Sequence, residues 1–149
     1  MRTLKTLTLD EAQQIIHHIN NEATHDNGAP VSIAVVGVDG ELTAFAAMDD
    51  VMPASRQIAV NKAKTAIAGR RDTLYWEIKK EKFPAFDGRD FTDVNFTCFA
   101  GGVVILKNNS FVGAIGVSGR KSKREIESGR SQDHELAVNA CTSFEHGEL

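Results

Sequence analysis

The residues best suited to chemistry in this sequence are glycines and a serine at the end of a predicted strand. Gly116 and Gly119 lie three positions apart, where the run 113–119 passes from that strand into a loop. Missing side chains there would let backbone N–H groups and the Ser118 hydroxyl approach an anionic ligand. A strand bulge or close packing of the strand on a helix would explain the same glycines. The run has neither G-x-G-x-x-G spacing nor a G-K-[ST] ending, so it does not indicate a nucleotide site.

A second glycine pair precedes the other strand of the same predicted hairpin. Gly101 and Gly102 stand just before the apolar run that begins at Val103. Two glycine-rich strand ends lying close together would leave room for the floor of a pocket. A simple turn explains the pair equally well.

Charged residues lie before and within a predicted alanine-rich helix. Met48, Asp49 and Asp50 precede it, where a carboxylate could cap the helix or contact a ligand. Lys62 and Lys64 interrupt its apolar residues, and Lys64 could direct its ammonium at a carboxylate-bearing ligand. The alternative for Lys64 is a solvated side chain on the outer face of the helix.

The histidines and cysteines do not form a metal motif. His17 and His18 are adjacent on a predicted helix and project about 100° apart, so they cannot share one metal ion. Either imidazole, His18 in particular, could be a single axial ligand to haem, although idle exposed histidines are the simpler interpretation. His134 has no second ligand at metal spacing and is interpreted as structural. Cys98 and Cys141 lack C-x-x-C spacing and are expected to be free thiols.

The helices and strands that must position these residues can be predicted from the spacing of apolar residues and from the residue types found at turns. A capping box over residues 8–11 begins the first helix, and Asp-Gly and Asn-Asn pairs mark two hairpin turns. The order of helix, hairpin, helix pair, loop, hairpin and helix predicts an α+β fold with a central antiparallel sheet covered by helices. The predicted ranges are helices over 9–26, 53–69 and 131–145, a short helix near 72–78, strands over 31–38, 42–47, 103–107 and 110–117, a possible strand over 96–99, and a loop over 83–95 that forms a lid or an interface.

Length and composition exclude several classes of protein. A chain of 149 residues with 42% hydrophobic and 25% charged residues is expected to form one domain over residues 1–149. Its net charge of −3 lacks the basic excess of a nucleic-acid-binding surface. No apolar run approaches the length of about 20 residues that spans a bilayer, and the sequence starts without an apolar secretory segment, so a cytoplasmic protein is expected.

Four blocks of the sequence, taken together, resemble the GlcG/HbpS family, which includes the C-terminal domain of PduO-type proteins. They cover nearly the whole chain: residues 31–42, Met48-Asp49 followed by 55–66, Gly101-Gly102 with 111–119, and 133–137. The resemblance implies a profilin-like fold, a homo-oligomer with tetramer to octamer as candidates, and a link to haem or corrinoid handling in some members. It also implies Met48, Asp49, Lys64, Gly102, Gly116, Ser118 and His18 as ligand-binding candidates.

The sequence departs from the family pattern at three places. Ala47 stands where members often carry an arginine, which removes a contact to an anionic group. Val103 and Val104 replace a frequent proline after the double glycine. The short link before the last helix is expanded into the charged segment 120–132, which is expected to be a solvated loop.

Three function classes follow from these residues. The first is a binding protein that holds haem or another acidic small molecule, with Lys64 and Ser118 at its carboxylates and His18 as axial ligand. The second is a small enzyme of a catabolic pathway that acts on a hydroxy acid or related carboxylate, with Asp49 as general base. The third is a purely structural or regulatory oligomer with a vestigial pocket, which is favoured by Ala47 in place of the frequent arginine.

Overall fold

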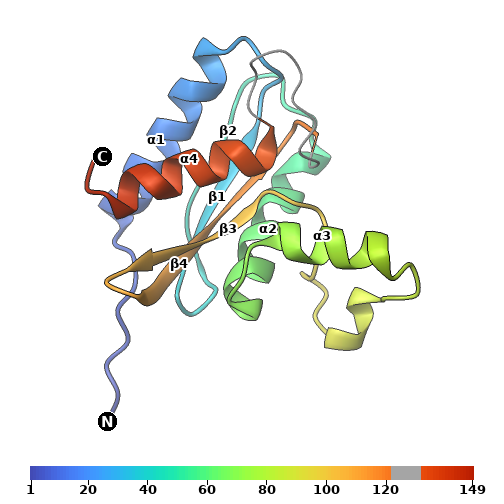
Figure 1. Ribbon diagram of the computed structural model, residues 1–149. Helices are drawn as coiled ribbons and strands as arrows, with labels where there is room; N and C mark the ends of the chain where they lie inside the picture. The colour runs from blue at the N-terminus through green and yellow to red at the C-terminus, as the bar shows by residue number, and fades with distance from the viewer. Residues whose placement is uncertain (122–131) are drawn as a thin grey trace.

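A computed structural model describes residues 1–121 and 132–149, and Figure 1 shows how the elements are arranged. The bounds are α1 Leu9–His25, β1 Ser32–Gly37, β2 Leu42–Ala47, α2 Ala54–Gly69, α3 Thr73–Lys82, the 3-10 helix η1 Gly88–Phe91, β3 Gly102–Lys107, β4 Ser110–Ser118 and α4 Asp133–Glu145.

The strands form one four-stranded antiparallel sheet in the order β2-β1-β4-β3. The two predicted hairpins are both present, and they meet along β1 and β4, where Ser32 pairs with Ser118 and Gly37 with Gly113. The α+β fold with a central antiparallel sheet is therefore confirmed. Sequence patterns predict each hairpin but not this pairing, because its partners lie about 80 residues apart.

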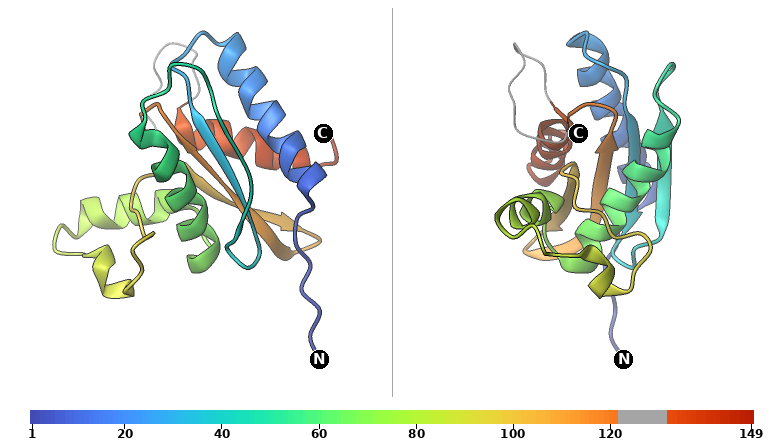
Figure 2. Two further views of the ribbon diagram at one scale, coloured as in Figure 1. Left: turned by 180° about the vertical axis from the view of Figure 1, so that it is seen from behind. Right: turned by 90° about the vertical axis from the view of Figure 1, so that its right-hand side faces the viewer.

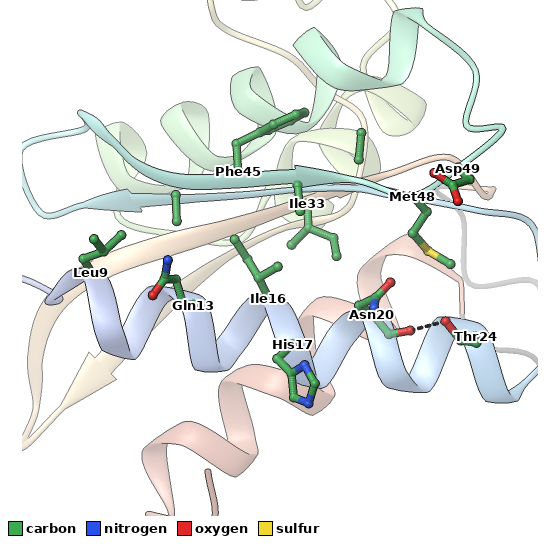
Figure 3. Close-up of a pocket in the computed structure, with 13 residues that line it drawn as sticks. Leu9, Gln13, Ile16, His17, Asn20, Thr24, Ile33, Phe45, Met48 and Asp49 are labelled. Carbon is green, nitrogen blue, oxygen red and sulfur yellow. Dashed lines mark hydrogen bonds between the residues drawn. The ribbon is translucent and has the colours of Figure 1, made fainter.

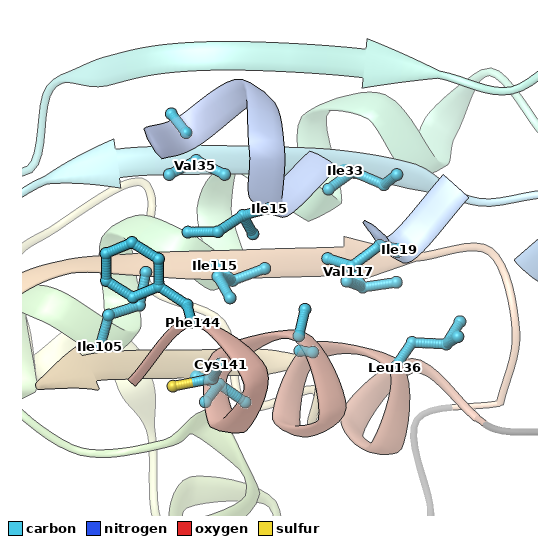
Figure 4. Packing of buried hydrophobic residues seen from close by; sticks show 14 of the residues in the cluster. Ile15, Ile19, Ile33, Val35, Ile105, Ile115, Val117, Leu136, Cys141 and Phe144 are labelled. Atoms are coloured by element: carbon cyan, nitrogen blue, oxygen red, sulfur yellow. The ribbon is translucent and has the colours of Figure 1, made fainter. Parts of the chain in front are cut away.

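Helices cover both faces of the sheet (Figure 2). On one face α1 and α4 pack on the larger of two hydrophobic clusters (Figure 4), while α2 covers the opposite face. Successive side chains of β1 point to opposite faces of the sheet. Ile33 and Val35 therefore belong to the first cluster, and Ala34 and Val36 to the second. The strand is buried at every position, as expected for the middle of a three-layer structure.

Local chemistry explains where these elements begin and turn. Thr8 and Glu11 form the predicted capping box, in which the Glu11 N–H donates to Thr8 Oγ1 and the Thr8 N–H donates to Glu11 Oε2. Asn108 and Asn109 both adopt positive φ, at 51° and 62°, which is the conformation that a two-residue hairpin turn requires.

The possible strand over 96–99 does not form. Thr65 on α2 holds this segment instead, because its hydroxyl donates to Asn95 O and accepts from the Thr97 N–H. The predicted loop over 83–95 contains η1, and its aromatic rings pack around Trp76 of α3. Phe91 and Phe96 stack with centroids 4.7 Å apart, and both lie edge-on to Trp76.

The start of the charged segment 120–132 is not solvated, which corrects that expectation for Arg120. Its guanidinium makes a bidentate ion pair with Asp26, with N–O distances of 2.6 and 2.8 Å, and donates to the carbonyls of Ala23 and Ala29. Gly28 leaves the space that the guanidinium fills. Arg120 therefore links the end of β4 to the end of α1. Residues 122–131, which include the first position of the helix predicted over 131–145, lie outside the described residues.

Candidate functional site

An open groove of about 810 Å³ runs between α1 and β2 (Figure 3). We call it the α1–β2 groove. Thirteen residues line it: Leu9, Gln13, Ile16, His17, Asn20, Thr24, Ile33, Ala44, Phe45, Ala46, Ala47, Met48 and Asp49. Its volume lies within the usual range for sites that bind small molecules, about 300 to 1,000 Å³.

Helical periodicity on α1 builds one wall of this groove. Leu9, Gln13, Ile16, Asn20 and Thr24 follow one another at steps of four, three, four and four, so they share a face beside the buried stripe that contacts the core. Figure 3 shows Ile16 pointing from this face toward the strands.

Small residues on β2 leave the opposite wall open. The strand ends in the run Ala44–Ala47, and the one large side chain there, Phe45, points away from α1 on the other face of β2 (Figure 3). Ala47 continues this run of short side chains at the end of the strand. The groove therefore has apolar walls with amide and hydroxyl groups along one side.

Three groups on the groove could take part in chemistry. His17 is exposed, and its Nε2 lies 3.1 Å from Asn21 Nδ2. Met48 is half-buried, with its sulfur 3.4 Å from the Val31 N–H. Asp49 presents an exposed carboxylate next to Met48. An imidazole and a thioether are both common axial ligands of haem iron.

The structure separates the residues that the sequence proposes for one site. Met48 and Asp49 lie together in the groove, but His18 does not line it. Its side chain is 31% exposed, and its Nε2 lies 4.0 Å from Glu22 Oε2. Lys64 lines a different, small depression near Asp39 and the turn after β1.

The expected pocket between the glycine-rich strand ends and the second long helix is filled. A methyl group added at Gly116 would overlap the Ala59 carbonyl oxygen, and one at Gly102 would overlap the Lys62 carbonyl. Both glycines thus allow β3 and β4 to approach the backbone of α2 closely, which is the structural alternative for the motif. Ser118 is only 6% exposed and sits at the end of β4, inside this packed layer.

A buried ion pair was missed by sequence reasoning, which considered Lys64 more informative than Lys62. Lys62 is 2% exposed, and its ammonium donates to Asp133 Oδ2 at 3.0 Å and to Val117 O at 2.9 Å. Removal from water lowers the pKa of Lys62, and it raises the pKa of Asp133 to about 6 despite the adjacent ammonium. The pair joins α2, β4 and the start of α4, so its evident role is structural.

The cysteines are free thiols, as expected. Cys141 is buried, which raises its pKa, and its thiol donates to Val104 O with an Sγ–O distance of 3.3 Å. Burial also raises the pKa of the half-buried Cys98. A raised pKa disfavours the thiolate, so neither thiol is activated as a nucleophile.

Across residues 1–121 and 132–149, no group of three or more His, Cys, Asp and Glu side chains could hold a metal ion. In the same described ranges, no helix combines the length and apolar character needed to span a membrane.

These features define an α+β domain of profilin-like type with an open groove beside its first helix. The family described as "Haem degrading protein HbpS-like" matches residues 7–142, which is most of the chain. The chain belongs to this HbpS-like family.

Curated relatives agree with this assignment. Protein GlcG of Escherichia coli K12 is 37% identical over 119 residues, which cover 79% of this chain and 85% of GlcG. A 15.0 kDa protein from the dhaT-dhaS intergenic region of Citrobacter freundii is 30% identical over 142 residues, covering 95% of this chain and 94% of that protein.

Solved structures share the fold. Protein ORFY of Klebsiella pneumoniae has a TM-score of 0.82 at 28% identity, covering 97% of this chain and 94% of ORFY. A PduOC–haem complex has a TM-score of 0.76 at 22% identity, with coverage of 93% and 94%. HbpS has a TM-score of 0.77 at 22% identity, with coverage of 95% and 92%.

Proposed function

We propose that this protein binds haem, or a similarly flat and largely apolar ligand with acidic substituents, in the α1–β2 groove. The observation that carries the proposal is a groove of about 810 Å³ with apolar walls, a thioether that points into it and an imidazole at its outer edge (Figure 3). A structural neighbour that is a haem complex and the family's haem-related description support it.

The walls suit a macrocycle. Ile16 on α1 and the alanines Ala44 and Ala46 on β2 offer apolar surface from both sides of the groove, so an apolar ring would be removed from water there. The thirteen lining residues, all within the described chain, include no lysine or arginine. Carboxylates of the ligand would therefore stay at the open mouth, near water and the amides of Gln13 and Asn20. Lys64 and Ser118 have no part in this arrangement.

The iron ligand in this proposal comes from His17 or Met48. His17 Nε2 lies 3.1 Å from Asn21 Nδ2, so coordination requires that this hydrogen bond be exchanged for a bond to iron. His18, the candidate from the sequence, points to a different place near Glu22. Adjacent histidines with different surroundings form a matched pair for testing.

The test is titration of the purified protein with haem while the visible spectrum is followed. We expect a saturable, stoichiometric shifted Soret band, which His17→Ala weakens and His18→Ala leaves unchanged. Met48→Leu, which keeps the volume but removes the sulfur, should alter the band if the thioether coordinates. A broad, unsaturable response in every variant would overturn the proposal. Loss of the band in His18→Ala alone would move haem to the Glu22 side of α1.

An enzyme acting on a small carboxylate is the second candidate, because the Asp49 carboxylate lines the same groove and is exposed. An exposed carboxylate next to a bound substrate can act as a general base. Turnover of a small hydroxy acid that disappears in Asp49→Asn, with folding intact by circular dichroism, would support this candidate. A panel of hydroxy acids without turnover would refute it.

A further inference from the structure

The strand β3 lies at one edge of the sheet, next to β4. Gly102, Val104 and Leu106 form its outer row, because their backbone N–H groups donate to side chains and not to β4. The outer row of an edge strand is a template on which another polypeptide strand can add. The run 103–106 consists of valine, isoleucine and leucine, so it is uncharged, lacks proline and is well suited to such pairing.

Two residues at the start of α3 cover the first part of this outer row. The buried Thr73 hydroxyl accepts from the Gly102 N–H at 2.8 Å and donates to Gly102 O at 3.5 Å. Asp72 Oδ1 accepts from the Val104 N–H at 3.0 Å. An aspartate at the N-cap usually accepts from the first turn of its own helix, but within the described chain Asp72 makes no such bond. Its carboxylate therefore serves the strand and not α3.

Two residues of α4 cover the next part. The Cys141 thiol donates to Val104 O with an Sγ–O distance of 3.3 Å (Figure 4). Glu145 Oε1 accepts from the Leu106 N–H at 2.8 Å and lies 3.2 Å from Cys141 Sγ. The spacing of four residues places both side chains on one face of α4. We call the four residues Asp72, Thr73, Cys141 and Glu145 the β3 edge cap.

We propose that the β3 edge cap is a built-in strand blocker, which prevents an extended segment of a second, partly unfolded copy of this chain from adding to β3. Side chains suit this task, because they satisfy the outer backbone groups without exposing a further row as a fifth strand would. They come from two helices that are far apart in the sequence, so the cap is complete only in the folded chain. The proposal is independent of ligand binding, since the thirteen residues of the α1–β2 groove include none of the four.

The first experiment measures hydrogen exchange of single amides by NMR in two double variants of equal charge. Asp72→Ala, Glu145→Ala removes both acceptors, whereas Asp72→Asn, Glu145→Gln keeps a side-chain oxygen at each position. In the alanine variant the Val104 and Leu106 amides should exchange faster than in the wild type by about tenfold, because each loses a hydrogen bond to a charged acceptor. In the asparagine–glutamine variant they should stay close to the wild-type rate.

The Val103 and Ile105 amides alternate with the outer row and face β4, so they are internal controls that should keep their rates. Unchanged Val104 exchange in the folded alanine variant would overturn the proposal. So would equal acceleration of the control amides, which would mean that the cap supports the whole fold and not the edge. Circular dichroism verifies folding. Glu145 is exposed at the last residue of α4, so the single variant Glu145→Ala, read at Leu106, keeps the test available if the double variant does not fold.

The second experiment measures strand addition itself with thioflavin T, a dye that reports stacked β-strands and not the mass of particles. Each chain is agitated at a urea concentration just below its own unfolding transition, which matches the variants in stability. The alanine variant should show a shorter lag and a larger signal than the wild type and the asparagine–glutamine variant. Equal curves for both double variants, with Val104 exchanging fast in the alanine variant, would show that the cap does not block strand addition.

Cys141 offers a matched pair for the same assay. Cys141→Ser keeps a donor for Val104 O, whereas Cys141→Val is close in size and removes the donor. We expect the valine variant to shorten the lag and the serine variant to behave as the wild type does. A shorter lag in the serine variant alone would contradict the role of this hydrogen bond in the cap.

Discussion

At the scale of single residues, the Lys62–Asp133 pair shows how burial decides the role of a charge. Both side chains are almost fully buried, at 2% and 1% exposed. The Arg120 N–H donates to the second carboxylate oxygen of Asp133 at 2.9 Å, so both oxygens have partners. A buried pair of this kind adds little net stability, but breaking it leaves an uncompensated buried charge.

Lys62→Met should therefore be strongly destabilising, by about 3 to 5 kcal/mol in urea unfolding at pH 8. Loss of the ammonium raises the pKa of Asp133 further above its unfolded value. Stability linked to a raised carboxyl pKa is present at low pH and is lost as pH rises through the folded pKa. The difference in the free energy of unfolding between Lys62→Met and the wild type should accordingly become smaller as the pH is lowered from 8 to 5.

The control is the double variant Lys62→Met, Asp133→Asn. It removes both charges and keeps an oxygen that can accept from the Arg120 N–H. Most of the lost stability should return, and the pH dependence should disappear. A double variant as unstable as Lys62→Met alone would show that the charge of Asp133 is not the cause.

At the scale of elements, the contact between β4 and α2 depends on the absence of a side chain. Gly116 faces Ala59 and Ala63 of α2, and a Cβ there would overlap the Ala59 carbonyl oxygen. Backbone atoms on a strand and a helix cannot move apart without shifting both elements.

Gly116→Ala should lower the free energy of unfolding by about 3 kcal/mol, at the upper end for overpacking a core. The matched control is Gly147→Ala, since nothing lies within 4 Å of a Cβ at that position. Its φ of 71° is unfavourable for alanine by about 1 to 2 kcal/mol, and no packing cost is added. Urea unfolding followed by circular dichroism compares the two. Equal effects would mean that α2 yields to the added methyl group.

At the scale of the whole molecule, the α1–β2 groove and a second cavity, of about 590 Å³, belong to different parts of the fold. The groove lies at the β2 edge of the sheet, whereas residues of α3, η1 and the segment before β3 line the second cavity. Figure 2 shows α3 and η1 projecting from the sheet. They share no lining residue.

Haem binding in the groove should therefore leave the second cavity unchanged. Cys98 lines that cavity, so it should be alkylated at the same rate with and without haem. A slower rate in the presence of haem would contradict the assignment of haem to the groove.

Local features of the fold could be predicted from the sequence. The capping box at Thr8, the Asn108-Asn109 turn and the change of hydrophobic period define helices and hairpins through neighbours a few residues apart. These interactions join residues within short segments, so their patterns can be recognised in the sequence without a three-dimensional structure. The same patterns misjudge 96–99, because Thr65 competes for its backbone groups from 30 residues away.

The sites were decided by tertiary packing. Lys62 and Lys64 lie two positions apart, which is about 200° around a helix, and only the position of the sheet determines which of them is buried. Gly116 is compatible with a pocket or with close packing until α2 is placed against it. His17 and His18 are likewise distinguished only by the position of β2 relative to α1. Composition and local pattern determined the elements, whereas contacts between distant segments determined which side chains share a site.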